Sequence, residues 1–132
     1  MEESAARELL GAQRQATLTR ISALTDDFEG IVATSSGSNL DDEHDPEGAT
    51  VAFERAQVTA LLDGARAHLD DLDRALARLA AGAYWVCERC SAPITSERLR
   101  ARPAIRTCIR CAAARSPRLR KQPNRPPASE NE

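Results

Sequence analysis

Four cysteines are the residues of this chain best suited to chemistry, and they fall into two CxxC pairs. Cys87 pairs with Cys90 and Cys108 with Cys111, and seventeen residues separate the pairs. Two thiolates three positions apart on a tight turn can both face one ion, and a second such turn completes a tetrahedral site of four sulfurs. Because protein then fills every coordination position, the site is structural and leaves no place for a substrate. The spacing therefore predicts one structural Zn²⁺ bound by these four cysteines.

Two disulfides are the alternative use of four cysteines. Disulfides persist mainly in oxidising compartments, which a chain reaches by way of a signal peptide. The N-terminal sequence MEESAARELL is acidic and has no long apolar run, and no stretch of the chain approaches the length of a membrane span. We therefore expect a cytoplasmic protein with reduced, zinc-bound cysteines and no membrane contact.

No arrangement of nucleophile and base is visible, so the sequence predicts that the protein is not an enzyme. The two histidines, His44 and His68, each stand alone. His68 directly precedes an apolar seam residue of a predicted helix and is expected to face solvent. His44 has Asp42 and Asp45 close by, but an isolated loop histidine is a weak metal-site signal.

The composition is that of long helices with a strongly uneven distribution of charge. Aromatic residues make up 3% of the chain and charged residues 29%, so a large mixed core cannot form. Residues 1–82 carry 16 acidic and 7 basic side chains, a net charge of −9, whereas residues 83–132 carry 4 and 11, a net charge of +7. An acidic body with a basic, cysteine-bearing end indicates two different partner surfaces, although solvated helix faces would give a similar pattern.

Two heptad seams predict two long helices, over residues 4–31 and 49–81. The first seam consists of Leu10, Thr17, Ile21, Leu24, Phe28 and Ile31. The second consists of Val58, Leu62, Ala65, Leu69, Leu72, Leu76 and Leu79. Each helix has one apolar stripe to bury, and the connecting segment is long enough to reverse the chain, so we expect an antiparallel coiled-coil hairpin. A parallel homodimer is the alternative, and a monomer is preferred.

The segments outside these helices complete the expected organisation. The connector, about residues 34–48, contains five acidic and no basic residues, namely Asp41, Asp42, Glu43, Asp45 and Glu47. Asp45 is suited to be the N-cap of the second helix with Pro46 in its first turn, and Gly82 is suited to end it. We predict a mainly α fold comprising a helical hairpin (1–82) with an acidic tip, a zinc finger (83–114) and a basic, proline-rich disordered tail (115–132).

Beyond the cysteines, a string of residues resembles the DksA/TraR zinc-finger family. The shared residues are Gly82, Tyr84, Cys87, Cys90, Pro93, Ile94, Arg98-Leu99, Ala101-Arg102-Pro103, Cys108 and Cys111. Members of this bacterial family bind RNA polymerase directly and insert the hairpin through its secondary channel toward the active centre. The resemblance therefore implies a transcription regulator with RNA polymerase as its partner and no sequence-specific DNA binding of its own.

The resemblance also implies that the working end is the hairpin tip, where Asp42, Asp45 and Glu47 are the expected partner-binding residues. The family tip reads DxxDxA at the start of the second helix. With Asp45 in the first position, Gly48 and Thr50 occupy the other two, and with Asp42 and Asp45 as the two acids, Glu47 occupies the alanine position. Neither of these two registers reproduces the motif.

Two other kinds of binding protein are compatible with the residues around the cysteines. A zinc ribbon that binds nucleic acid would use the basic residues of this region, which are Arg98, Arg100, Arg102, Arg106 and Arg110. Such binding would weaken steeply with salt. A redox-responsive interaction module would instead open when its thiols are oxidised and release a partner.

Overall fold

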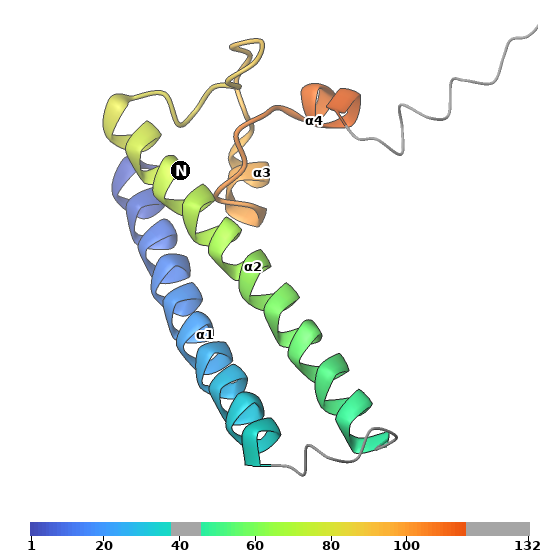
Figure 1. The fold of residues 1–132 in the computed structure, drawn as a ribbon. Helices are drawn as coiled ribbons and strands as arrows, with labels where there is room; N and C mark the ends of the chain where they lie inside the picture. The colour runs from blue at the N-terminus through green and yellow to red at the C-terminus, as the bar shows by residue number, and fades with distance from the viewer. Residues whose placement is uncertain (38–45, 116–132) are drawn as a thin grey trace, which may run out of the picture. The chain divides into compact units, whose positions relative to one another are not determined.

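The computed structural model describes residues 1–37 and 46–115 of the chain, and these residues are mainly helical (Figure 1). The helices are α1 (Glu3–Gly37), α2 (Pro46–Ala81), α3 (Ser96–Ala101) and α4 (Ile109–Arg115). An isolated β-bridge pairs Val86 with Pro93. The predicted mainly α fold, with two long helices followed by a cysteine-bearing module, is confirmed. Within the described ranges, no helix combines the length and the apolar content that a bilayer span requires.

The chain divides into two compact units. Residues 10–73 form one unit, and residues 1–9 together with the chain from Arg74 onward form the other. The first unit contains most of both long helices and is called the hairpin unit below. The second contains all four cysteines and is called the cysteine unit.

In the hairpin unit, α1 and α2 run antiparallel and bury the two predicted seams against each other (Figure 1). A buried cluster of Leu24, Leu62 and Ala65 is covered by the partly buried Ile21, Phe28 and Val58. Leu10 and Leu72 are completely buried. Burial of one apolar stripe per helix supplies most of the stability of such helices, because each is marginal alone. The heptad prediction is therefore confirmed at the level of single residues.

Two polar side chains in or beside the seams, those of Thr17 and Arg14, have partners. Thr17 lies in the first seam and is 7% exposed, and its hydroxyl donates a hydrogen bond of 2.8 Å to the carbonyl of Gln13. Farther out, Arg14 Nε lies 2.6 Å from Asp73 Oδ1 and links the two helices. Both side chains are well exposed, so solvent screens this ion pair and it adds little to stability.

The ends of the long helices differ in part from the prediction. Helix α1 continues to Gly37, beyond the predicted end at Ile31. Residues 32–37 contain no proline, and a helix that is already formed extends at little cost. Helix α2 begins at Pro46, as expected for a proline in the first turn.

The predicted stop of α2 at Gly82 is confirmed. Gly82 has a φ of +80°, in the left-handed region that favours glycine. Its N–H bonds the carbonyl of Leu79 at 3.1 Å, and the N–H of Ala83 bonds the carbonyl of Arg78 at 2.8 Å. These two bonds form a Schellman motif, which satisfies the last carbonyls of the helix and turns the chain toward the cysteines.

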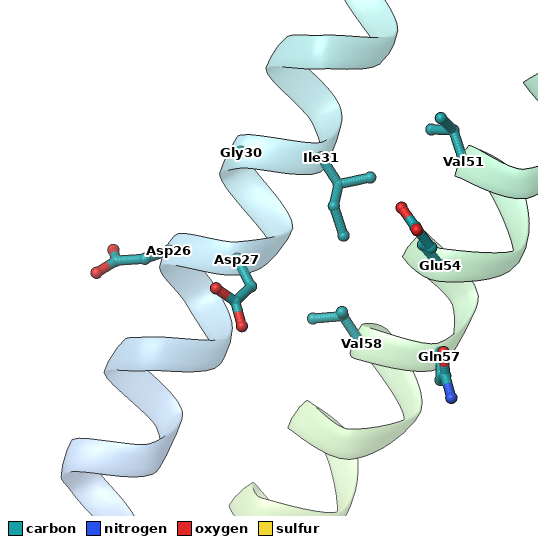
Figure 2. Close-up of a pocket in the computed structure, with 8 residues that line it drawn as sticks. All are labelled: Asp26, Asp27, Gly30, Ile31, Val51, Glu54, Gln57 and Val58. Carbon is teal, nitrogen blue, oxygen red and sulfur yellow. The ribbon is translucent and has the colours of Figure 1, made fainter. Parts of the chain in front are cut away.

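A groove lies between α1 and α2 in the part of the hairpin unit nearest the connector (Figure 2). It has a volume of about 540 Å³ and is lined by Asp26, Asp27, Gly30, Ile31, Val51, Glu54, Gln57 and Val58. Partly exposed apolar side chains and carboxylates thus line the same groove.

Candidate metal centre

The first cysteine pair lies on a tight turn that backbone hydrogen bonds close. The N–H of Cys87 bonds the carbonyl of Ala92 at 2.8 Å, and the N–H of Ser91 bonds the carbonyl of Cys87 at 2.9 Å. Ser91 has a φ of 65°, which only glycine adopts without strain. This turn folds Cys90 back beside Cys87 and so directs both sulfurs to the same side.

The second pair is held by a different element, the start of helix α4. Cys108 directly precedes α4, and Cys111 lies in its first turn. The N–H of Ala112 bonds the carbonyl of Cys108 at 2.9 Å, which fixes this turn. Residues three apart share a helix face, so the two sulfurs project together.

The two elements bring all four sulfurs into one cluster. The Sγ atoms of Cys87, Cys90, Cys108 and Cys111 all lie within 4.8 Å of one another. The Sγ atoms of Cys90 and Cys108 are 3.7 Å apart, and all four cysteines are free rather than disulfide-bonded. A tetrahedral Zn²⁺ with Zn–S bonds of about 2.3 Å requires sulfurs about 3.8 Å apart. The cluster therefore has the ligand type and dimensions of a site that can hold a metal ion.

The protonation chemistry of the cluster also suits a cation. Burial raises the pKa of the Cys87 thiol, but backbone N–H groups of Cys108, Cys90 and Arg89 outweigh it and lower the pKa to about 6. The Arg89 N–H lies 3.4 Å from Cys87 Sγ. Burial and the neighbouring sulfurs raise the pKa of Cys111 to about 12. The site thus favours deprotonation of Cys87 and opposes deprotonation of Cys111, because the sulfurs are crowded together. A divalent cation would neutralise the negative charge on the sulfurs and allow all four thiols to ionise.

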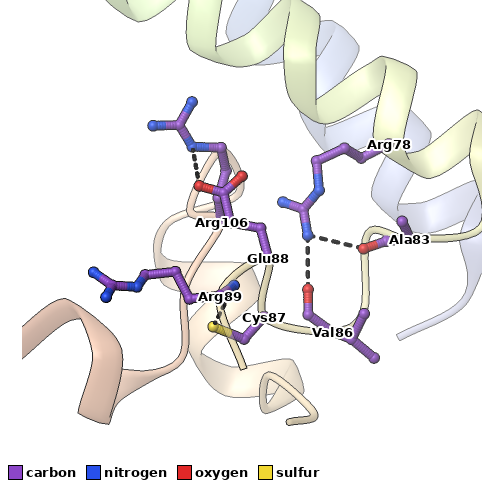
Figure 3. A network of polar contacts seen from close by, with 7 residues as sticks. All are labelled: Arg78, Ala83, Val86, Cys87, Glu88, Arg89 and Arg106. Atoms are coloured by element: carbon purple, nitrogen blue, oxygen red, sulfur yellow. Dashed lines mark hydrogen bonds and ion pairs between the residues drawn. The ribbon is translucent and has the colours of Figure 1, made fainter. Parts of the chain in front are cut away.

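Arg78 ties the end of α2 to the segment that leads into the first turn (Figure 3). Its Nη2 donates to the carbonyl of Ala83 at 2.8 Å and to the carbonyl of Val86 at 2.7 Å. One guanidinium therefore holds both ends of a short connecting segment whose next residue is Cys87. Sequence analysis missed this role, because nothing in the local sequence marks Arg78 as different from other helix arginines.

Two further arginines connect the segments within the module. The N–H of Glu88 bonds the carbonyl of Arg106 at 2.9 Å, and their side chains form an ion pair at 3.6 Å (Figure 3). Arg98 Nε donates to the carbonyl of Thr107 at 3.1 Å. Two of the five arginines considered for nucleic-acid binding therefore have structural roles, which weakens that interpretation. The other three of these arginines, Arg100, Arg102 and Arg110, are exposed.

Several residues of the string that resembles the DksA/TraR family form the small core of this unit. Tyr84 is completely buried and its hydroxyl donates to the carbonyl of Pro103 at 2.8 Å. Ile94 and Leu99 are also buried. Thr95 caps α3, its hydroxyl accepting a bond of 3.2 Å from the N–H of Arg98. The spacing of these residues thus serves to pack a module that has few apolar side chains of its own.

The remaining candidate residues are only partly located. Asp42, Asp45 and His44 lie outside the described residues, as does the predicted tail from residue 116. Glu47 lies in the first turn of α2, directly after Pro46. His68 is exposed on α2, as predicted.

An antiparallel helical hairpin followed by a compact module with four clustered cysteines defines a class of small proteins with one end that can hold a metal ion. Among solved structures, this chain is similar to that of the transcription factor DksA2 from Pseudomonas aeruginosa, with a TM-score of 0.74 and 30% sequence identity. The alignment covers 89% of this chain and 85% of that one. The search against protein-family models gave no match, and the search of curated proteins gave none. The chain belongs to the DksA/TraR family, which confirms the resemblance found in its sequence.

Proposed function

We propose that this chain is a zinc-binding transcription regulator that binds RNA polymerase and inserts its hairpin into the secondary channel, thereby modulating initiation. The observation that carries the proposal is the likeness to a transcription factor over 89% of the chain, which includes both the hairpin and the cysteine module. The same likeness supports RNA polymerase, rather than a specific DNA sequence, as the direct partner.

Zinc is the metal that this site is expected to hold. Four thiolates in a closed arrangement select Zn²⁺ over hard cations such as Mg²⁺. Its role would be structural, since no coordination position is left for water or substrate. Cys108→Ser should abolish stoichiometric zinc binding and disorder residues 84–112, while circular dichroism retains most of the helical signal of the hairpin. Full zinc stoichiometry in this variant would show that the ligand assignment is wrong.

The start of α2 suggests a third way to match the tip motif. Because α2 begins at Pro46, its first turn contains Glu47, Gly48 and Ala49. Placing Glu47 in the second acidic position puts Ala49 in the alanine position and leaves His44 in the first. This register matches two of the three positions, with a carboxylate one methylene longer than that of aspartate. It makes Glu47 the tip acid to test first, followed by Asp45.

The decisive experiment separates binding from activity. Purified wild-type protein should co-elute with RNA polymerase, and a second ligand that occupies the secondary channel should compete with it. In promoter-dependent transcription in vitro, Glu47→Gln and Asp45→Asn should each reduce the effect on transcript yield while retaining polymerase binding. Glu29→Gln, an exposed acid on α1, is the matched control. Failure to co-elute, or binding that a blocked channel leaves unchanged, would eliminate the proposal.

A further inference from the structure

Helix α2 has an apolar face that does not pack against α1. Helix α1 covers the side of α2 that carries Val58, Leu62 and Ala65 (Figure 1). The opposite side of such a helix is ordinarily charged. On α2, six exposed positions of that side, spaced by three or four residues, carry no charge. They are called the outer face below and are Ala49, Phe53, Ala56, Ala60, Gly64 and Ala67.

Two residues of the outer face are unfavourable on a helix surface that meets only water. The Phe53 side chain is large and apolar, and the residue is 68% exposed. Alanine is common on exposed helices because it favours the helix, but a glycine in a helix interior costs about 1 kcal/mol relative to alanine. At Gly64, an added Cβ would meet no atom within 4 Å. The outer face thus combines an exposed ring with open space over a glycine.

The outer face reads almost the same in both directions. Phe53 and Gly64 lie nearly equally far on either side of its centre, which is near position 58, and so do Ala56 and Ala60. A second α2 laid on this face in the antiparallel direction therefore places its Gly64 under the ring of Phe53, and alanines meet alanines. Small residues let the two helices approach closely. The face is thus complementary in shape to a second copy of itself.

Charges beside the outer face are complementary in the same arrangement. Arg55 and Asp63 line a second groove of the hairpin unit, about 500 Å³ in volume, which Ala56 and Ala60 also line. Within the part of the chain that the structure describes, neither charged side chain has an ion pair or a hydrogen bond. They lie eight positions apart on one flank of α2. Antiparallel pairing places Arg55 opposite Asp63 of the second copy, twice by symmetry, whereas parallel pairing places like charges together.

We propose that the outer face binds the outer face of a second copy of this chain, with the two α2 helices antiparallel and Arg55 paired with Asp63 across the interface. Residues 49–67 span about 27 Å of helix. A contact of this length is small, so the dimer is reversible and forms in the micromolar rather than the nanomolar range. Self-association goes beyond the proposed function. If that function holds, the dimer is a form in which the hairpin is covered on one side, and the monomer is the form that enters the channel.

Sedimentation equilibrium of the full-length, zinc-loaded chain tests the outer face. Between about 1 and 200 μM, the average mass of the wild type should rise from that of a monomer toward that of a dimer. Ala60→Glu places a charge in the centre of the face and should weaken self-association by about tenfold or more. Ala16→Glu, on the exposed surface of α1, adds the same charge to the same unit and should stay within about twofold of wild type.

Charge reversal tests the direction of the two helices. Arg55→Asp and Asp63→Arg each place like charges together in a homodimer, so each variant alone should associate about tenfold or more weakly than wild type. An equimolar mixture of the two variants restores both ion pairs and should form a heterodimer. The double variant Arg55→Asp with Asp63→Arg should self-associate as the wild type does. A merely structural role of these side chains would give no such rescue.

The outcomes separate this proposal from the proposed function, because no polymerase is present in these measurements. A wild type that stays monomeric throughout would overturn the proposal, as would a dimer that Ala60→Glu leaves unchanged. Single charge variants that fail to associate when mixed would overturn the antiparallel pairing. A wild type that self-associates as described but does not bind polymerase would reject the proposed function and leave the dimer standing.

Discussion

At the scale of single residues, the first cysteine turn depends on a backbone conformation that its sequence does not favour. Ser91 has a φ of 65°, where the Cβ of any residue other than glycine crowds the following carbonyl. The hydrogen bond from its N–H to Cys87 holds it there. A glycine at this position would adopt the same left-handed geometry without strain.

Replacing Ser91 with glycine should therefore stabilise the zinc-bound protein. Relief of the left-handed strain contributes about 1–2 kcal/mol, and the greater freedom of glycine in the unfolded chain offsets part of it, so we expect a net gain of about 1 kcal/mol. Thermal unfolding of the zinc-loaded protein is the measurement. Ser22→Gly, on the exposed surface of α1, should have the opposite sign and cost about 0.5 kcal/mol. A loss of stability in Ser91→Gly would mean that its side chain has a role that the backbone argument omits.

Arg78 is a second single residue with a large expected effect, because it connects the end of α2 to the segment that leads into the cysteine module. Its guanidinium donates to two carbonyls, at 2.8 and 2.7 Å, and Arg78→Ala leaves both without this partner. We expect a loss of about 2 kcal/mol and faster release of zinc to a chromogenic chelator. Arg78→Lys should recover less than half of the loss, because an ammonium group lacks the planar fork of donors. Arg66→Ala, on the exposed face of α2, is the control, and equal zinc release rates in the two alanine variants would contradict the assignment.

At the scale of the elements, the hairpin is held by its seam, and adjacent leucines provide a matched test. Leu62 is 6% exposed within the central cluster, whereas Leu61 is 44% exposed. Leu62→Ala should lower the free energy of unfolding by about 2–4 kcal/mol, through lost burial and the cavity that remains. Leu61→Ala should cost less than about 1 kcal/mol. Urea unfolding followed at 222 nm checks both, and equal losses would mean that α1 and α2 do not pack through the seam.

The features that could be predicted from sequence are those with a local signal. The seam through Leu62 and Leu72 repeats every three or four residues, and the two CxxC pairs have a fixed spacing, so both could be recognised before the fold was known. Gly82 also carries a local signal as a helix stop. The extension of α1 to Gly37 has no such signal, because it depends on how far an already formed helix continues.

Contacts between distant segments could not be predicted in this way. Arg106 is one of several arginines near the cysteines, and only the folded path of the chain brings it to Glu88. The groove between α1 and α2 is a similar case, since Asp27 and Glu54 are 27 positions apart and line the same groove only in the antiparallel hairpin. Tertiary structure thus decides which charged residues bind internally and which remain available to a partner.

At the scale of the whole molecule, the two units should depend on the metal to different degrees. The hairpin unit has a continuous apolar seam, whereas the cysteine unit buries few large side chains besides Tyr84, Ile94 and Leu99. A small module of this kind relies on its metal for folding, and zinc binding can supply on the order of 10 kcal/mol. Removing zinc should therefore unfold one unit and spare most of the other.

Chelation tests this dependence directly in the full-length chain. After zinc is removed by a strong chelator, Tyr84 and Trp85 should lose their protected environment, since the 5.0 Å edge-to-face ring contact belongs to the folded cysteine unit. Most of the signal at 222 nm should remain, because α1 and α2 supply most of the helical residues. Binding to RNA polymerase should weaken together with the tryptophan signal. Added Zn²⁺ should restore both, and added Mg²⁺ neither, because thiolates select the softer ion. If the metal-free protein instead keeps its tryptophan environment and loses its helical signal, the metal supports the hairpin rather than the module, and the cysteine unit must be stabilised by contacts other than its four sulfurs.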